Sequence, residues 1–121
     1  MTRTRATAKQ AGTAFETLIA GYLAEHVSEF IERRRLTGAA DRGDLGGVRC
    51  TGGGRVIAEC KNHGGRVSVG PWLTEAGIER GNDDAAAGVV VAKRRGTTDP
   101  GEQIVLMTVD DLVALLTGHR P

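Results

Sequence analysis

The segment GVVVAKRR, residues 88–95, is the feature that most constrains the fold of this chain. It is a β-branched run with no polar residue before Lys93, which is typical of a strand buried on both faces of a sheet. Such a sheet needs helices on both sides. At 121 residues, the chain is long enough for one domain of this kind and too short for two.

Three segments have the pattern of helices. Residues 14–35, AFETLIAGYLAEHVSEFIERRR, place apolar side chains at helical spacing and end in three arginines, which suit the negative pole of a helix dipole. Residues 71–88 open on a proline, a common first residue of a helix. Residues 109–120 predict a short closing helix that ends at Gly118.

The remaining strands complete the sheet. Residues 45–50 and 55–61 predict two antiparallel strands joined by a glycine turn at 52–54, and residues 102–110 predict another strand. We therefore expect a single α/β domain over residues 11–121, with a mixed central sheet flanked by helices.

The strand RVIAECK places opposite charges where burial is expected. Side chains alternate along a strand, so Ile57, Glu59 and Lys61 share one face, with Glu59 and Lys61 about 7 Å apart at the backbone. The predicted hairpin brings Asp44 beside Glu59. The result is a pair of acids with an ammonium group next to them.

This trio suits the hydrolysis of phosphodiesters. Carboxylate oxygens favour Mg²⁺ or Mn²⁺, and the backbone carbonyl of Cys60 is a further candidate ligand. Lys61 would orient a water molecule or stabilise the developing negative charge. The alternative is an ordinary surface salt bridge between Glu59 and Lys61, of little value to stability.

The sequences GD at Gly43–Asp44 and ECK at 59–61 resemble the motif of the PD-(D/E)XK nuclease superfamily. Within it, the chain looks most like the Holliday junction resolvases of the archaeal and phage type. The resemblance implies a restriction-endonuclease-like fold and a homodimer that makes paired nicks in a four-way DNA junction. It also implies that Asp44 and Glu59 are metal ligands and that Lys61 is the catalytic lysine.

Two assignments within this resemblance leave alternatives open. Glu16 corresponds to a helical glutamate that reaches the metal in the family; otherwise it is a solvated residue beside the apolar stripe. Asp41 competes with Asp44 as the motif aspartate. Asp44 is preferred because it follows Gly43 and lies nearer the hairpin.

Clusters of basic residues indicate a surface that faces a polyanion, although each cluster alone is also compatible with solvated element ends. Residues 1–10 are expected to form a flexible basic arm. Asn62 and His63 either contact the DNA backbone or only begin a loop. The candidate DNA-binding residues are Arg3, Arg5, Lys9, Arg33, Arg34, Arg35, Asn62, His63, Arg66, Lys93, Arg94 and Arg95.

Other features set the context. Cys50 and Cys60 have no metal-binding spacing and are expected to be reduced. Trp72 is expected to be a core anchor more than a stacking platform or a dimer contact. No apolar run predicts a membrane span or a signal peptide, so a cytoplasmic protein of a cell or a phage is expected. The other functions to weigh are a restriction-like or repair nuclease that cuts duplex DNA, a non-catalytic DNA-binding module of the same fold, and a plain interaction domain.

Overall fold

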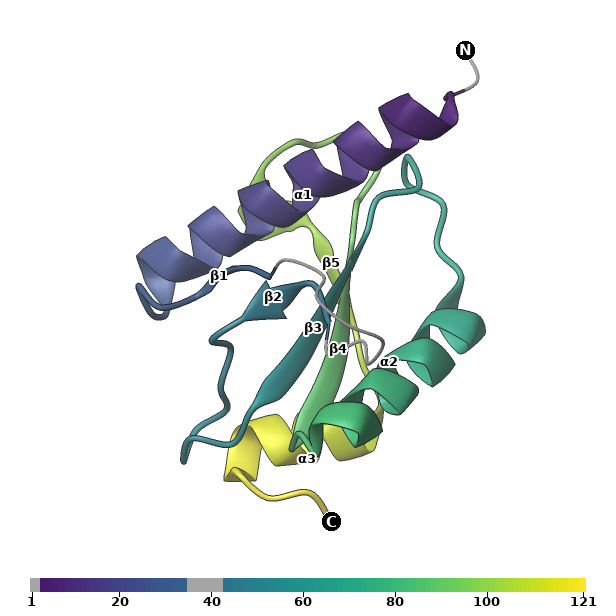
Figure 1. Cartoon of the computed structure of the whole chain (residues 1–121). Coiled ribbons are helices and arrows are strands. Elements are labelled where there is room, and N and C mark those ends of the chain that lie inside the picture. The colour runs from purple at the N-terminus through teal and green to yellow at the C-terminus, as the bar shows by residue number, and fades with distance from the viewer. Residues whose placement is uncertain (1–2, 35–42) are drawn as a thin grey trace.

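The computed structural model describes residues 3–34 and 43–121, which form an open five-stranded sheet with helices on both sides (Figure 1). The elements are α1 (Arg5–His26), β1 (Glu32–Arg33), β2 (Leu45–Gly46), β3 (Val56–Lys61), α2 (Val69–Asp83), β4 (Ala87–Ala92), η1 (Pro100–Glu102), β5 (Ile104–Leu106) and α3 (Val109–Thr117). The strands lie in the order β1-β2-β3-β4-β5, with β3 and β4 parallel and the other neighbours antiparallel. The predicted α/β class with a mixed sheet is confirmed. No described helix is long and apolar enough to cross a membrane.

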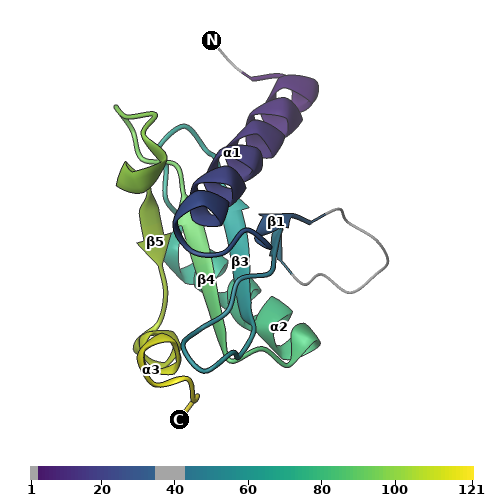
Figure 2. The same cartoon turned by 90° about the vertical axis from the view of Figure 1, so that its left-hand side faces the viewer.

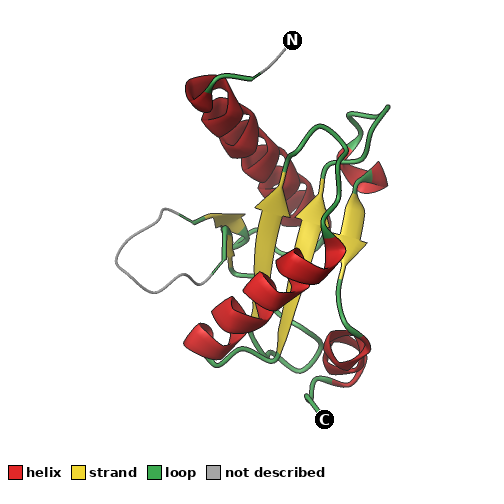
Figure 3. Cartoon of the chain, turned by 90° about the vertical axis from the view of Figure 1, so that its right-hand side faces the viewer, coloured by secondary structure: helices red, strands yellow, loops and turns green. Residues whose placement is uncertain are grey.

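The helices form two layers around the sheet (Figures 2 and 3). Phe15 and Ile19 of α1 and Ala114 of α3 belong to one hydrophobic cluster with residues of β3 and β4. Trp72 and Ala76 of α2 form a second cluster on the other face, with Val90 and Ala92 of β4. Trp72 is therefore a core residue, as expected. All six residues of β4 are buried, which confirms the prediction from the β-branched run.

Helix α2 lies close to the sheet because of a glycine. A Cβ atom at Gly88 would lie 3.0 Å from the carbonyl oxygen of Ala76, closer than ordinary packing allows. Glycine at this point of β4 lets the backbone of α2 approach. The close approach matters for function, because it brings the polar side chains of α2 down onto the face that carries Glu59 and Lys61.

The predicted hairpin is present. Leu45 of β2 pairs with Ala58 of β3, and Arg49 forms an isolated antiparallel bridge with Arg55. Gly52 and Gly53, at the turn, have φ values of 93° and 97°, a conformation that glycine adopts without strain. The turn therefore has the residues it requires. The pairing shifts by one residue between Arg49–Arg55 and Leu45–Ala58, so the register beside Asp44 is not the one that the turn sets.

The first helix begins earlier than expected. Its first residue is Arg5, and the hydroxyl oxygen of Thr4 caps it by accepting a hydrogen bond from the N–H of Thr7 at 3.1 Å. The prediction of a flexible arm over residues 1–10 is therefore wrong from Arg5 onward, and Lys9 lies on the helix. A threonine cap followed by the helix formers Ala6, Ala8, Lys9, Gln10 and Ala11 was the local signal for this start.

The first helix also ends earlier than expected, at His26 and not near residue 35. Ser28 makes the difference, because its hydroxyl accepts the N–H of Phe30 at 3.3 Å and its carbonyl accepts the N–H of Ile31 at 3.0 Å. This serine turn replaces the helical bonds. Ile31 is then buried, and Arg33 lies in β1 instead of at a helix end.

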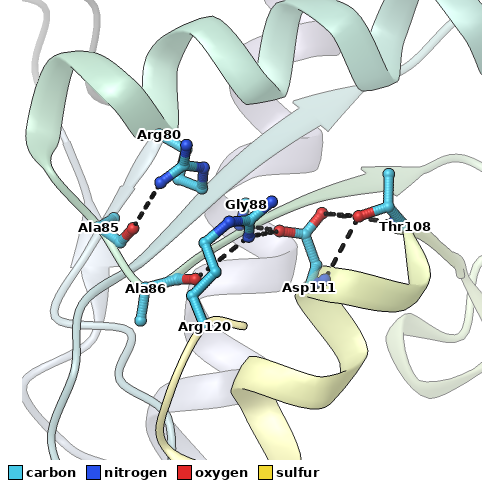
Figure 4. A network of polar contacts seen from close by, with 7 residues as sticks. All are labelled: Arg80, Ala85, Ala86, Gly88, Thr108, Asp111 and Arg120. Atoms are coloured by element: carbon cyan, nitrogen blue, oxygen red, sulfur yellow. Dashed lines mark hydrogen bonds and ion pairs between the residues drawn. The ribbon is translucent and has the colours of Figure 1, made fainter.

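Helix α3 is attached to the sheet by a buried aspartate (Figure 4). Asp111 accepts hydrogen bonds from the N–H of Gly88 at 3.2 Å, from a guanidinium nitrogen of Arg120 at 2.6 Å, and from the hydroxyl of Thr108 at 2.8 Å. Thr108 and Asp111 also form a capping box. Burial raises the pKa of Asp111, but Arg120, Thr108 and Gly88 outweigh it, so the pKa lies below its ordinary value.

Replacing Asp111 with asparagine is expected to destabilise the fold by about 2–3 kcal/mol, because every partner of this carboxylate is a donor and an amide offers only one acceptor. Asp110→Asn, one residue away and exposed, is the matched control and should change little. The depressed pKa means that the stabilisation is present above about pH 4 and is lost as the pH falls through the folded-state value. Urea unfolding at pH 7 and pH 3 measures both effects, and an equal loss at both pH values would contradict them.

Candidate functional site

The charged face of β3 lies under α2. The Nζ atom of Lys61 donates to both carboxylate oxygens of Glu75, at 3.0 and 3.1 Å. Glu59 lies two residues earlier on the same face and is only 7% exposed. The predicted shared face of Glu59 and Lys61 is therefore present, and it is covered by a helix rather than open to solvent. A simple surface salt bridge does not describe it.

Asp44 lies next to this pair through the register of the hairpin. Because Leu45 pairs with Ala58, Asp44 falls opposite Glu59 and on the same face of the sheet. Its Oδ2 atom accepts the N–H of Cys60 at 2.8 Å, and its own N–H donates to the carbonyl of Ala58 at 2.9 Å. The aspartate is thus held against β3 by both backbone and side chain.

Gly43 explains why a glycine precedes this aspartate. Its φ is 86°, and a Cβ atom there would lie 2.8 Å from a methyl carbon of Ile57 and 3.1 Å from the carbonyl oxygen of Ala58. Only glycine fits this close approach without displacing β3. The Gly-Asp pair therefore has a physical basis: the glycine allows the backbone to pack on β3, and the aspartate follows it into the site.

Helix α2 adds two acids that the sequence analysis did not identify. One carboxylate oxygen from each of Glu59, Glu75 and Glu79 lies within 4.8 Å of the other two. Glu79 is 3% exposed and shares its helix face with Trp72 and Ala76, which are both buried. A glutamate in register with a buried apolar stripe was the signal that marked α2 as part of the site.

Glu16 approaches Asp44 from α1, which packs on the face of the sheet opposite α2. Its Oε2 atom accepts a hydrogen bond from Nε of Arg33 at 2.7 Å. Burial raises the pKa of Glu16, Arg33 opposes the rise, and the negative charge of Asp44 adds to it. Glu16 is therefore half-buried and paired with Arg33 near Asp44, and the alternative of a solvated residue beside the apolar stripe is wrong.

The acids dominate the electrostatics of the site. Burial lowers the pKa of Lys61, but Glu75, Glu59 and Asp44 outweigh it and raise the pKa above its ordinary value. Burial, followed by the charges of Asp44, Glu16 and Glu59, raises the pKa of the Cys60 thiol well above its usual range. Lys61 is thus a fully charged ammonium at neutral pH, and Cys60 stays a neutral thiol.

The backbone carbonyl of Cys60 faces the edge of β3 that β2 leaves open. The N–H of Cys60 bonds to the side chain of Asp44, whereas the carbonyl of Lys61 accepts from Lys93 on the opposite side. Because the N–H and C=O of one strand residue point the same way, the Cys60 carbonyl points toward Asp44. Its predicted role as a ligand is compatible with this direction.

Glu75 is the partner that should set the protonation of Lys61. Replacing Glu75 with glutamine is expected to lower the pKa of Lys61, since Glu75 contributes most of the opposition to burial. NMR titration of the lysine side chains measures this, with the exposed Lys9 as an internal control. An unchanged pKa of Lys61 would show that Glu59 and Asp44 keep the lysine charged without a contribution from Glu75.

The candidate DNA-binding residues fall into two regions. Arg33 and Arg34 lie in or beside β1, and the backbone N–H of Arg34 donates to the carbonyl of Asp44 at 2.7 Å. The others lie at the start of α1 or follow the ends of β3 and β4, which are neighbours because these strands are parallel. They are Arg3, Arg5, Lys9, Asn62, His63, Arg66, Lys93, Arg94 and Arg95. Arg35 and Asp41 lie outside the described residues.

Some of these basic residues already have protein partners. The Nζ atom of Lys93 donates to the backbone carbonyls of Arg94 and Thr97, and Arg33 pairs with Glu16. Arg94 and Arg95 are exposed. Lys93 therefore holds its loop in place and Arg33 joins β1 to α1, whereas Arg94 and Arg95 are exposed.

The acidic group has the chemistry of a hard cation site. Three carboxylates lie within 4.8 Å of one another, two of them on residues that are almost fully buried, and such a concentration of negative charge is stabilised by a nearby cation. Oxygen donors of this kind favour divalent ions such as Mg²⁺, Mn²⁺ or Ca²⁺. The residues therefore fit a metal ion. Comparisons with protein-family models, with curated proteins and with solved structures found no significant match.

Proposed function

We propose that this protein is a metal-dependent DNA endonuclease with a restriction-endonuclease-like fold, related in its site to the PD-(D/E)XK nucleases. The observation that carries the proposal is the arrangement on β3: Glu59 and Lys61 share one face, Asp44 lies just before β2 with its side chain bonded to β3, and two glutamates of α2 lie over the face. Acids and one ammonium group on a common face are the groups that phosphodiester hydrolysis requires.

The side chains have distinct roles in this proposal. Glu59, with Asp44 and the α2 glutamates, would hold Mg²⁺ or Mn²⁺. A divalent cation held by these residues would supply Lewis acidity at the phosphoryl oxygen and a water of lowered pKa. Lys61 donates a hydrogen bond that orients the attacking water or offsets the negative charge that develops on the phosphate. The ion pair between Glu16 and Arg33 joins α1 to β1 near Asp44.

The proposed substrate is a four-way DNA junction, cut by paired nicks from a homodimer. Basic residues lie on both sides of the acidic group, from Arg33 and Arg34 near β1 to the segments after β3 and β4. Contacts of this kind position a phosphate backbone without identifying bases, which suits an enzyme that selects DNA by its shape. A nuclease that cuts ordinary duplex DNA is the second candidate in the same chemistry.

The decisive experiment compares DNA substrates. Purified protein is incubated with four-way, three-way and linear duplex DNA of matched sequence, with Mg²⁺ or with EDTA. Symmetric paired nicks in the four-way junction alone would support a resolvase, and cuts in linear duplex would support a duplex nuclease. No Mg²⁺-dependent cleavage of any substrate would contradict the proposal.

The ion pair between Lys61 and Glu75 is also compatible with a protein that has no catalytic activity. The ion pair between Lys61 and Glu75 would also occur in a DNA-binding or interaction domain that performs no hydrolysis. Such a domain would show no affinity for a divalent cation at Glu59, Glu75 and Glu79. Metal binding and cleavage therefore separate the two functions.

A further inference from the structure

A second site adjoins the acidic group on the side of the N-terminal part of α1. A pocket of about 560 Å³ lies between the first turns of α1 and the loop that follows β3. Figure 1 shows this loop beside that end of the helix. Its polar lining residues are Arg3, Lys61, Asn62, His63 and Arg66, and small residues of α1 and Cys60 complete the wall.

The charged side chains that line the pocket are all positive. Arg3, Lys61 and Arg66 each carry a positive charge, and the described lining includes no carboxylate. The pKa of His63 lies below its ordinary value. Burial is the largest cause, followed by the positive charges of Arg66, Lys61 and Arg3. Arg3, Lys61 and Arg66 lie around a common space, because all three line the pocket.

Protein contacts hold the lining in place. A guanidinium nitrogen of Arg3 donates to the backbone carbonyl of Asn62 at 3.0 Å, and the Asn62 amide donates to the carbonyl of Ala11 at 3.4 Å. His63 lies against Trp72 with ring centroids 5.2 Å apart, and its Nδ1 is 3.4 Å from a guanidinium nitrogen of Arg66. Such contacts reduce the entropy that the side chains lose on binding a ligand.

Lys61 joins the pocket to the acidic group. It lines the pocket and at the same time donates to Glu75, which belongs to the carboxylate cluster. An anion in the pocket therefore lies beside whatever the acidic group acts on. Two arginine forks with a lysine and a histidine match the oxygens of a phosphate group better than those of a smaller or neutral ligand.

We propose that this pocket binds a backbone phosphate of the substrate strand, the one next to the phosphate that is cut. The inference rests on the proposed nuclease function for the identity of the strand, but the pocket itself is defined by its own residues. Binding there would set which phosphodiester reaches the acids. The pocket thus acts as a positioning site, and Arg3 and Arg66 as positioning residues.

The first test uses the histidine as a reporter. The chain has three histidines, and His26 and His119 serve as internal controls. In NMR titrations with thymidine 5′-monophosphate or inorganic phosphate, the pKa of His63 should rise, because a bound anion offsets the three cations. Arg66→Gln should weaken the response about tenfold or more, whereas Arg49→Gln, at the far glycine turn, should not. If the pKa of His63 does not change at saturating phosphate, the proposal that this pocket binds an anion is wrong.

The second test asks whether the anion is an internal phosphate of DNA. Single neutral methylphosphonates are placed in turn along one strand, and binding is measured without Mg²⁺ so that nothing is cut. Wild-type protein should lose about tenfold in affinity at one position, and Arg66→Gln should be insensitive at that same position. Sensitivity only to a terminal phosphate, or to free phosphate alone, would overturn the assignment to the backbone.

The two proposals fail in different ways. If the methylphosphonate position is found but no DNA is cleaved with Mg²⁺, the pocket stands as a phosphate site and the nuclease function falls. If cleavage occurs but Arg66→Gln cuts at the same bond with unchanged affinity and KM, the nuclease stands and the positioning role of the pocket is wrong.

Discussion

Replacing Glu59 with glutamine, or Asp44 with asparagine, is expected to reduce DNA cleavage about a thousandfold or more and to leave DNA binding nearly unchanged. Each change removes one negative charge from the proposed metal site, and a loss of about 4 kcal/mol in stabilisation of the transition state corresponds to that factor. Binding persists because the positive side chains that contact phosphates are untouched. Initial rates on four-way DNA, with gel-shift affinities measured in EDTA, check both parts.

The two substitutions are conservative enough to keep the fold. An asparagine at position 44 retains an oxygen that accepts the N–H of Cys60, so the contact between Asp44 and β3 survives. A glutamine at position 59 has the shape of the glutamate it replaces. Glu25→Gln, an exposed change on α1, is the matched control for a lost carboxylate and should cleave at the wild-type rate. Full activity of either site variant under Mg²⁺ would rule out the mechanism.

The sequence was most informative where one local cause determines the structure. The valine run of β4 has no polar face, so burial on both sides was its only favourable arrangement. The glycines at 52 and 53 fix the turn that joins the two segments of the hairpin. Gly43 belongs to the same class, because the backbone there needs a residue with no Cβ.

The prediction was wrong where two local signals compete. The apolar spacing of residues 14–35 continues past His26 through Val27, Phe30 and Ile31, so periodicity alone extended the helix. The hydrogen bonds of Ser28 ended it, and Phe30 is 77% exposed as a result. A serine that bonds to its own downstream backbone can outweigh periodicity near a helix end, and the sequence pattern has no measure of that balance.

The α2 glutamates were missed for a different reason. Glu75 and Glu79 are separated from Glu59 by 16 and 20 positions, and only the parallel return of β4 beside β3 lays α2 across the charged face. The motif on β3 was visible because its residues are neighbours in sequence. The complete set of acids depends on tertiary packing, so a motif search of one strand could not include it.

Divalent cations are expected to stabilise the protein against unfolding, with an effect that depends on the α2 glutamates. At a concentration about 100 times the dissociation constant, Mg²⁺ or Mn²⁺ bound to the folded state adds about 2.7 kcal/mol, or roughly 10 °C in Tm for a chain of this size. Replacing Glu79 with glutamine should weaken binding by tenfold to a hundredfold, which reduces the gain to about 1.4 to 0.4 kcal/mol at the same concentration.

The same measurement decides between two possible ligand sets. The resemblance implies Asp44 with Glu59, whereas the structure groups the carboxylates of Glu59, Glu75 and Glu79 within 4.8 Å. Glu59→Gln lowers the metal-induced gain in either case, so it cannot separate them. If α2 supplies ligands, the metal should no longer stabilise the Glu79→Gln variant, whereas it should stabilise the Glu25→Gln variant as it does the wild type. If Asp44→Asn loses the metal-induced gain in stability and Glu79→Gln keeps it in full, α2 only covers the site, and its Glu75 serves to hold Lys61 in place.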